Sequence, residues 1–162
     1  MRWGKINSFT MKFKEWLLVN EETYGILRLW RASDFDDVFS GMSFGEELET
    51  AKLYTNNSGF GGDTIYYADI NMNNMEVLEI NDYEDLCDAL GIHRDDCNLY
   101  SRVGGTIAQA IPKLDDVREK LAERGYDWVA VREDYSEGTT TWQPVSEKSI
   151  SSIELHEYEG AS

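Results

Sequence analysis

The chain has 162 residues, of which 41% are hydrophobic and 12% aromatic, so we expect one domain with a substantial apolar core. Its 31 acidic and 15 basic residues give a formal net charge of −16, and such a surface repels nucleic acid and attracts basic partners. No apolar run is long enough for a membrane span and no signal-peptide region opens the chain, so we expect a cytoplasmic protein of a bacterial cell.

The first quarter of the sequence contains one segment that suits either a helix or an extended arm, and one segment that predicts a strand. Apolar residues recur at helical spacing over residues 9–20, which are expected to form a helix or an extended arm. Residues 25–32 read as a strand whose alternation places Arg28 on one face and Arg31 on the other, each beside large apolar side chains. A buried guanidinium is costly, so each arginine is expected to find an anionic partner or solvent.

Short elements are predicted to follow. Ser33 resembles a helix N-cap and Asp36 is favourable in a first turn, so a short helix is expected from Asp34 to a stop at Gly41. The next segments are a helical turn or two at 46–51, a brief strand at 52–55, a glycine-rich loop at 56–63 and a well-defined strand at 64–70.

The second half alternates strands and helices irregularly, which is typical of an α+β fold. Asp82 is expected to cap a helix that Gly91 ends, and Pro112 is expected to interrupt a helix over 106–124 whose apolar stripe is Leu114, Val117 and Leu121. Strands are expected at 75–80, at 128–131 after the helix stop Gly125 and at 139–143, and a last strand or helix at 151–158.

The two cysteines indicate no metal site. Cys87 and Cys97 match neither a CxxC pair nor a disulfide framework, and with His93 they match no standard zinc spacing. We expect ordinary thiols in a reducing cytoplasm.

Polar clusters leave alternatives open. The glycines at 59–62 suit either a phosphate approach or a plain turn, and Glu133, Asp134 and Glu137 suit either a catalytic carboxylate or a solvated hairpin tip. The net charge suits either a solvated surface or an acidic decoy that occupies a nucleic-acid-binding groove. Phosphate-loop, HExxH and GxSxG motifs are absent from the sequence.

Several weak motifs follow one another along the chain. They are Leu29-Trp-Arg-Ala32 with the helical segment after it, Lys52-Leu-Tyr-Thr55, Ile65 to Met72, Val77 to Ile80, Gly125-Tyr-Asp-Trp-Val129, and Thr141 to Ile153. Their order resembles the small mono-ADP-ribosyltransferase-like domains of the phage and toxin type, including ADP-ribosylating anti-defence proteins. The resemblance implies an α+β fold with a split antiparallel sheet and short flanking helices, over a core at 25–153 that follows an N-terminal helix or arm at 1–24 in a single domain.

The resemblance also implies a cofactor and residues that hold it. Members of this family cleave NAD and transfer ADP-ribose to a target, through a transition state that a carboxylate stabilises. By resemblance, Arg31 would grip NAD, Tyr54 would stack on the nicotinamide or line the pocket, and Thr55 and Gly61 would approach the cofactor.

The expected acid departs from the family pattern. Thr141 stands at the cofactor where the family has its catalytic glutamate, and threonine carries no charge. Either the acid comes from the preceding turn, with Asp134 and Glu133 ahead of Glu137, or the domain lacks transfer activity.

Two functions follow as expectations. The first is NAD-dependent mono-ADP-ribosylation of a bacterial host or defence protein. The alternative is a non-enzymatic acidic phage inhibitor that binds a basic nucleic-acid-handling protein and blocks it.

Overall fold

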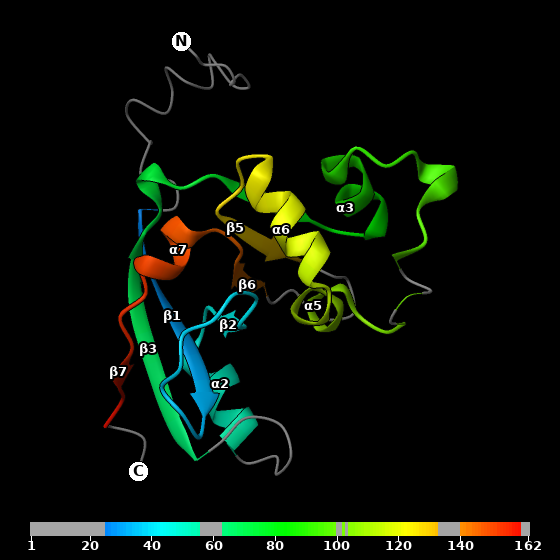
Figure 1. Ribbon diagram of the computed structural model, residues 1–162. Helices are drawn as coiled ribbons and strands as arrows, with labels where there is room; N and C mark the ends of the chain where they lie inside the picture. Colours follow the sequence, from blue (N-terminus) through cyan, green and yellow to red (C-terminus); the bar gives the residue numbers. More distant parts are fainter. Residues whose placement is uncertain (1–24, 56–62, 100–101, 103, 133–139, 160–162) are drawn as a thin grey trace.

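The strands form one sheet. The computed structural model describes residues 25–55, 63–99, 102, 104–132 and 140–159 (Figure 1). The sheet has the order β4-β5-β6-β2-β1-β3-β7. Its pairs are antiparallel except β4 with β5, so the α+β class is confirmed. The strands are β1 Ile26–Ser33, β2 Phe44–Gly45, β3 Thr64–Asn71, β4 Val77–Ile80, β5 Trp128–Val131, β6 Thr141–Pro144 and β7 His156–Glu157.

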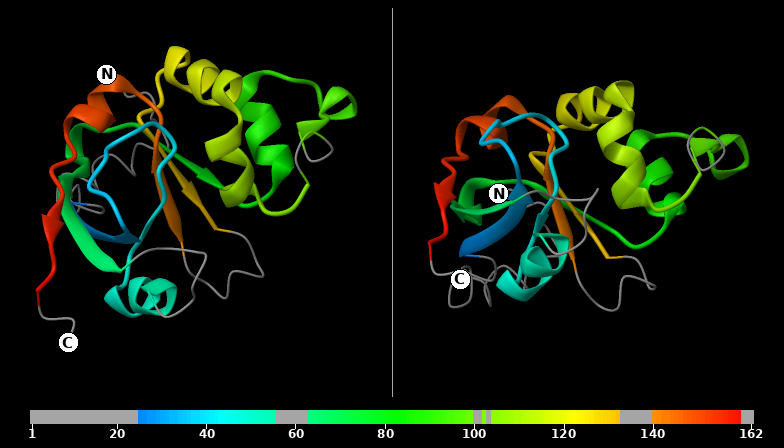
Figure 2. Two further views of the ribbon diagram at one scale, coloured as in Figure 1. Left: turned by 60° about the horizontal axis from the view of Figure 1, so that its bottom comes forward. Right: turned by 90° about the horizontal axis from the view of Figure 1, so that it is seen from below.

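The helices are short. Figure 2 shows α3, α5 and α6 together beside the β4–β5–β6 end of the sheet, whereas α2 lies near the β1–β3 pair. In the described part of the chain, no helix is long and apolar enough to cross a bilayer. The helices are α2 Leu48–Thr55, α3 Tyr83–Leu90, α5 Ile107–Ala110, α6 Asp115–Glu123 and α7 Glu147–Ser151, with 3-10 turns at Met72–Asn74, Arg94–Asp96 and Ile111–Lys113.

Several sequence expectations are confirmed where local chemistry decides the structure. The Asp82 carboxylate accepts a hydrogen bond from the Asp85 amide, and Gly91 takes φ 75°, so α3 begins and ends as expected. Pro112 lies in a 3-10 turn between α5 and α6, where it interrupts the expected long helix. The stripe on α6 is buried, with Leu121 fully covered.

Two apolar clusters hold the layers together. One lies where α3, α5 and α6 cover the β4–β5–β6 end of the sheet, and it includes Leu86, Ile111, Leu121 and Val131. The other surrounds three fully or nearly fully buried aromatic side chains of the central strands, which are Phe44, Trp128 and Trp142. Burial of such aromatic groups is a large favourable contribution to folding.

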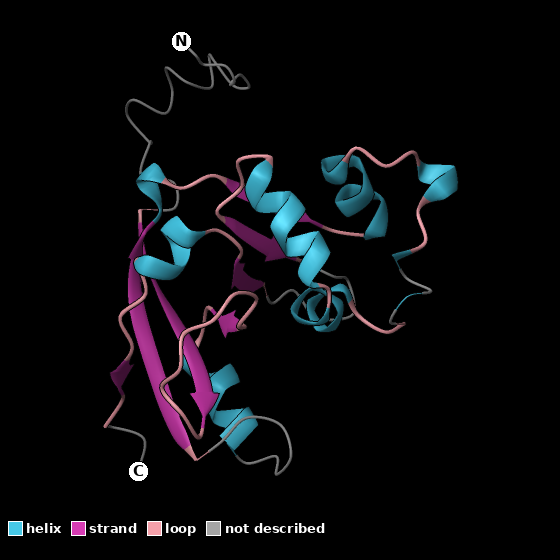
Figure 3. Ribbon diagram, viewed as in Figure 1, coloured by secondary structure: helices cyan, strands magenta, loops and turns pink. Residues whose placement is uncertain are grey.

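Two predicted elements are wrong. Residues 34–40 form no helix, and they run as an irregular loop between β1 and β2 (Figure 3). The Ser33 hydroxyl accepts from the Phe35 amide at 3.1 Å and so closes a turn in place of capping a helix. Residues 52–55 belong to α2 and not to a strand, because Ala51 is buried there and the Thr55 hydroxyl donates back to the Lys52 carbonyl.

The other predicted strands agree with the structure to within a few residues, whereas β2 and α7 were not predicted. β1 and β3 pair over their full length, from Ile26 with Asn71 to Ser33 with Thr64. The expected helix or arm within residues 1–24 and the loop at 56–62 lie outside the described residues, and the single-domain division stays a prediction.

The expected split sheet is not confirmed. The β4–β5–β6 and β1–β3–β7 groups are joined through β2, which pairs with β1 only at Trp30 and Gly45. The sheet is therefore continuous, although only one residue pair joins β2 to β1. It also contains the parallel pair β4–β5, so it is not purely antiparallel as expected.

The expectation of free thiols is wrong. Cys87 of α3 and Cys97 are joined by a disulfide, with their Cα atoms 6.1 Å apart. The helix end at Gly91 reverses the chain, so residues ten apart in sequence meet. Sequence spacing alone did not indicate this contact.

Candidate functional site

The described part of the chain contains only some of the predicted site residues. Arg31 lies on β1, Thr55 ends α2, and Thr141 begins β6. Tyr54 lies on α2, but its side chain is outside what the structure describes, as are Gly61, Glu133, Asp134 and Glu137. The predicted acids and their role therefore stay predictions.

The sheet register separates two of these residues. Trp30 pairs with Gly45, and Gly45 pairs with Thr141, so their side-chain positions share one face of the sheet. Because successive residues of a strand alternate, Arg31 belongs to the opposite face. Arg31 and Thr141 are close in the sheet, but they do not face each other.

Arg31 is a partly buried cation that pairs with no carboxylate among the described residues. Its Nη1 donates to the Ser43 carbonyl at 3.1 Å, and its guanidinium lies 5.2 Å from the Phe39 ring centroid. Its Nε is buried and has no hydrogen-bond partner within the part of the chain that the structure describes. Burial lowers the pKa of Arg31 from its ordinary value.

Arg28, on the other face of the same strand, has the opposite environment. Its Nε and Nη2 donate to the two carboxylate oxygens of Asp69 at 2.7 and 2.8 Å. These hydrogen bonds raise the pKa of Arg28 and lower the pKa of Asp69. Each arginine was expected to find an anionic partner or solvent, and in the described structure only Arg28 has a carboxylate partner.

The loop between β1 and β2 presents large apolar side chains to solvent. Phe35, Val38 and Phe39 have exposed fractions of 68%, 36% and 44%. They are interspersed with three exposed aspartates, which are Asp34, Asp36 and Asp37. We call residues 34–39 the acidic–aromatic loop.

Hydrogen bonds fix both ends of this loop. The Asp34 carboxylate accepts from the Asp63 amide at 3.0 Å, next to the end of β1. At the far end, the Gly41 amide donates to the Pro144 carbonyl at 2.8 Å. The loop is therefore held in place beside the sheet while its apolar side chains stay exposed, so it is a candidate interaction surface.

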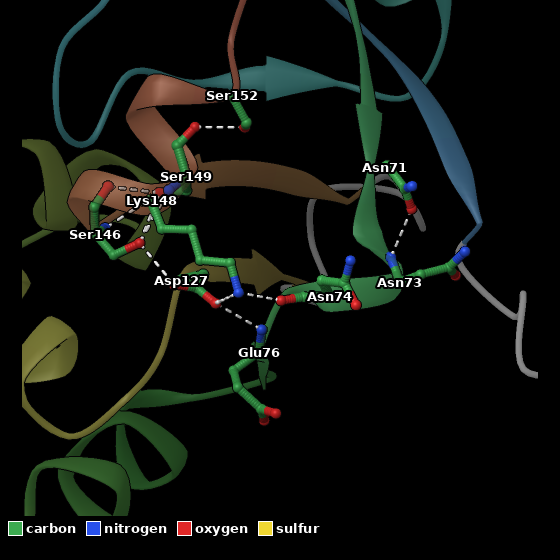
Figure 4. A network of polar contacts seen from close by, with 9 residues as sticks. All are labelled: Asn71, Asn73, Asn74, Glu76, Asp127, Ser146, Lys148, Ser149 and Ser152. Carbon is green, nitrogen blue, oxygen red and sulfur yellow. Dashed lines mark hydrogen bonds and ion pairs between the residues drawn. The ribbon is translucent and has the colours of Figure 1, made fainter.

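A buried polar network lies elsewhere and has a structural role. The Asp127 carboxylate accepts from the Glu76 amide at 2.9 Å and from the Ser146 hydroxyl at 2.7 Å (Figure 4). Lys148 lies 3.9 Å from the same carboxylate and donates to the Asn74 carbonyl. These contacts join the start of β4, the start of β5 and the N-terminus of α7. Both oxygens of the Asp127 carboxylate already accept hydrogen bonds within the protein, which favours a structural role over substrate binding.

The acidic–aromatic loop was missed at the sequence level. The expected helix covers these residues, and Phe35, Val38 and Phe39 recur at the i, i+3 and i+4 spacing of a helical face. The local pattern therefore favours a helix, and only the structure shows a loop with these side chains exposed. Among the described residues, no group of three His, Cys, Asp or Glu side chains is arranged to hold a metal ion.

Comparison with known proteins gives one structural match. No protein-family model and no curated protein matches the chain, and no ADP-ribosyltransferase family is identified. One solved structure, described as the crystal structure of an anti-CRISPR protein, aligns with a TM-score of 0.43 and 19% sequence identity. The alignment covers 83% of this chain and 96% of that chain. Similarity at this level does not establish a shared function.

Proposed function

We propose that this protein is a non-enzymatic acidic inhibitor that docks on the basic, nucleic-acid-binding face of a bacterial host or defence protein. One observation carries the proposal. The acidic–aromatic loop exposes Phe35, Val38 and Phe39 among three aspartates, on a chain with a net charge of −16.

The two kinds of side chain have different roles in such a contact. Exposed phenylalanine rings supply apolar area that is buried in a partner's pocket, and a few such anchors carry most of the binding free energy in protein interfaces. The aspartates and the wider acidic surface match a positively charged groove, speed association and disfavour acidic partners. A groove that binds nucleic acid has this complementary charge.

The test is competition between this protein and nucleic acid. The protein is titrated into complexes of a labelled duplex with purified basic nucleic-acid-binding proteins, RNA-guided nuclease complexes among them. We expect displacement of the duplex from at least one of them. The affinity should fall about tenfold or more between about 50 and about 200 mM salt. Binding that leaves the duplex in place, or no binding across the panel, contradicts the proposal.

A second candidate function is mono-ADP-ribosyl transfer from NAD, and one observation favours it. Arg31 is a desolvated cation with no carboxylate partner in the described structure, and a dinucleotide's phosphates would supply that partner. The test is incubation with labelled NAD and a bacterial lysate. Label transferred to a protein by the native chain, and lost with Arg31→Met, would support this function; no transfer would exclude it.

A further inference from the structure

A second surface feature begins directly after the acidic–aromatic loop. Ser40, α6 and α7 enclose a hollow of about 470 Å³, which is in the size range of ligand pockets. Its apolar lining comes from Ala122, Val145 and Ile150. We call it the α6–α7 groove.

Carboxylates line this groove. Asp115, Glu119 and Glu123 are four residues apart along α6, so they lie on one face of the helix, and Glu147 of α7 completes the set. Like charges at this spacing repel one another and destabilise the helix. In the described part of the chain, Glu119, Glu123 and Glu147 have no ion-pair partner, so this repulsion is not relieved internally.

The arginine in the groove is already committed. Arg118 donates from Nε to the Ser40 hydroxyl at 3.0 Å and from Nη1 to the Ile111 and Pro112 carbonyls at 2.8 Å each. Its Nη2 pairs with Asp115. Arg118 therefore fixes the wall of the groove, and the other carboxylates remain for an external cation.

The shape of the site selects the kind of cation. No three carboxylates among the described residues converge as metal ligands, which disfavours a divalent ion. An apolar lining beneath separated carboxylates instead suits a long side chain with an aliphatic stem and a charged head. Lysine and arginine have this form, and the planar guanidinium pairs best with carboxylates.

We infer that the α6–α7 groove receives arginine or lysine side chains of the partner, whose apolar surface covers the adjacent Phe39. Ser40 of the groove directly follows Phe39 in the sequence, so the groove begins where the acidic–aromatic loop ends. The identity of the partner as a nucleic-acid-binding protein rests on the proposed function, whereas the chemistry of the groove does not.

The probe is a synthetic peptide of alanines with arginine at every fourth position, titrated into the isotope-labelled protein while amide chemical shifts are recorded. The same peptide with neutral citrulline in place of arginine keeps the shape and removes the charge. The test variant is Glu119→Gln with Glu123→Gln. The matched control is Glu157→Gln with Glu159→Gln, at the β7 edge of the sheet, which removes the same charge from exposed positions.

The arginine peptide should shift the amides of residues 119–123 and 147–150, and the citrulline peptide should not. The α6 variant should bind the arginine peptide about fivefold more weakly, and the control within about twofold of the native chain. Equal losses in both variants, shifts outside the groove, or the same local shifts with Mg²⁺ would overturn the inference. If the arginine peptide binds in the groove but the protein displaces no nucleic acid, the proposed function is wrong and the groove inference stands. If the protein displaces nucleic acid but the peptide does not bind in the groove, only the groove inference is wrong.

Discussion

The Arg31 guanidinium lies 5.2 Å from the centre of the Phe39 ring, and this contact joins the sheet to the acidic–aromatic loop. The cation interacts with the ring face and with one carbonyl, but with no carboxylate in the described structure. Arg31 is therefore a poorly satisfied charge beside an exposed aromatic residue. In the proposed inhibitor, Phe39 contacts the partner protein. In the candidate ADP-ribosyltransferase, Arg31 binds the phosphates of NAD.

Arg31 and Arg118 offer a matched comparison, because both side chains are partly buried and, of the two, Arg118 makes more of the described hydrogen bonds. We expect Arg31→Met to leave the free energy of unfolding within about 0.5 kcal/mol of the native value, because an unpaired buried cation is costly. Arg118→Met should cost about 2–4 kcal/mol, because it removes contacts to two carbonyls, a hydroxyl and a carboxylate. Urea unfolding measures both, and an equal loss would show that Arg31 is needed for the fold.

Gly41 and Gly104 test how the loop is held. Both have positive φ, at 85° and 72°, so alanine is strained at either position. A Cβ on Gly41 would lie 2.9 Å from the Arg118 side chain and 3.2 Å from Pro112, whereas nothing lies within 4 Å at Gly104. We expect Gly104→Ala to cost about 1 kcal/mol and Gly41→Ala about 1–2 kcal/mol more. Equal thermal shifts would contradict this packing.

The sequence predicted those elements whose ends are set by local chemistry. The Asp82 cap and the Gly91 turn act within a few residues, so α3 could be placed from them alone. The structure of residues 52–55 could not be predicted in this way, because these residues favour a strand but continue α2, which the buried Ala51 anchors. Tertiary packing therefore determined the helical structure of this segment.

The candidate surfaces were less predictable than the fold. The arginine on each face of β1 was expected to find an anion or solvent. The structure shows that Arg28 pairs with Asp69, whereas no described carboxylate pairs with Arg31. The groove depends on how α6 and α7 approach each other, which no pattern within either helix specifies. The spacing of Asp115, Glu119 and Glu123 was the one local signal for it.

Asp127 is expected to contribute strongly to stability. Asp127→Ala would remove the carboxylate that accepts the part-buried hydrogen bonds of the Glu76 amide and the Ser146 hydroxyl, at a cost of about 2–4 kcal/mol. Asp127→Asn retains one acceptor oxygen and should cost about half as much. Urea unfolding of the two variants measures the difference, and a cost below about 1 kcal/mol for Asp127→Ala would contradict the structural role.

Acid should weaken the fold through two exposed ion pairs. Hydrogen bonds from Arg28 and Arg102 lower the pKa values of Asp69 and Asp116 below their ordinary value of 3.8. Their contribution is therefore present above that value and is lost as the pH falls through the lower, folded-state pKa. Both pairs are solvent-exposed, so the effect is small. The Asp69→Asn, Asp116→Asn double variant should lose less stability than the native chain between about pH 5 and about pH 2. An identical loss would contradict the assignment.

The most direct test of the account compares two exposed side chains on neighbouring segments. Phe35 and Ile26 each have an exposed fraction of 68%, but only Phe35 lies on the acidic–aromatic loop. The measurement is the concentration of each variant that displaces a duplex from the partner identified by competition. We predict that Phe35→Ala needs about tenfold more protein than the native chain and that Ile26→Ala stays within about twofold of it. Unchanged displacement by Phe35→Ala, or an equal loss in both variants, would contradict the account.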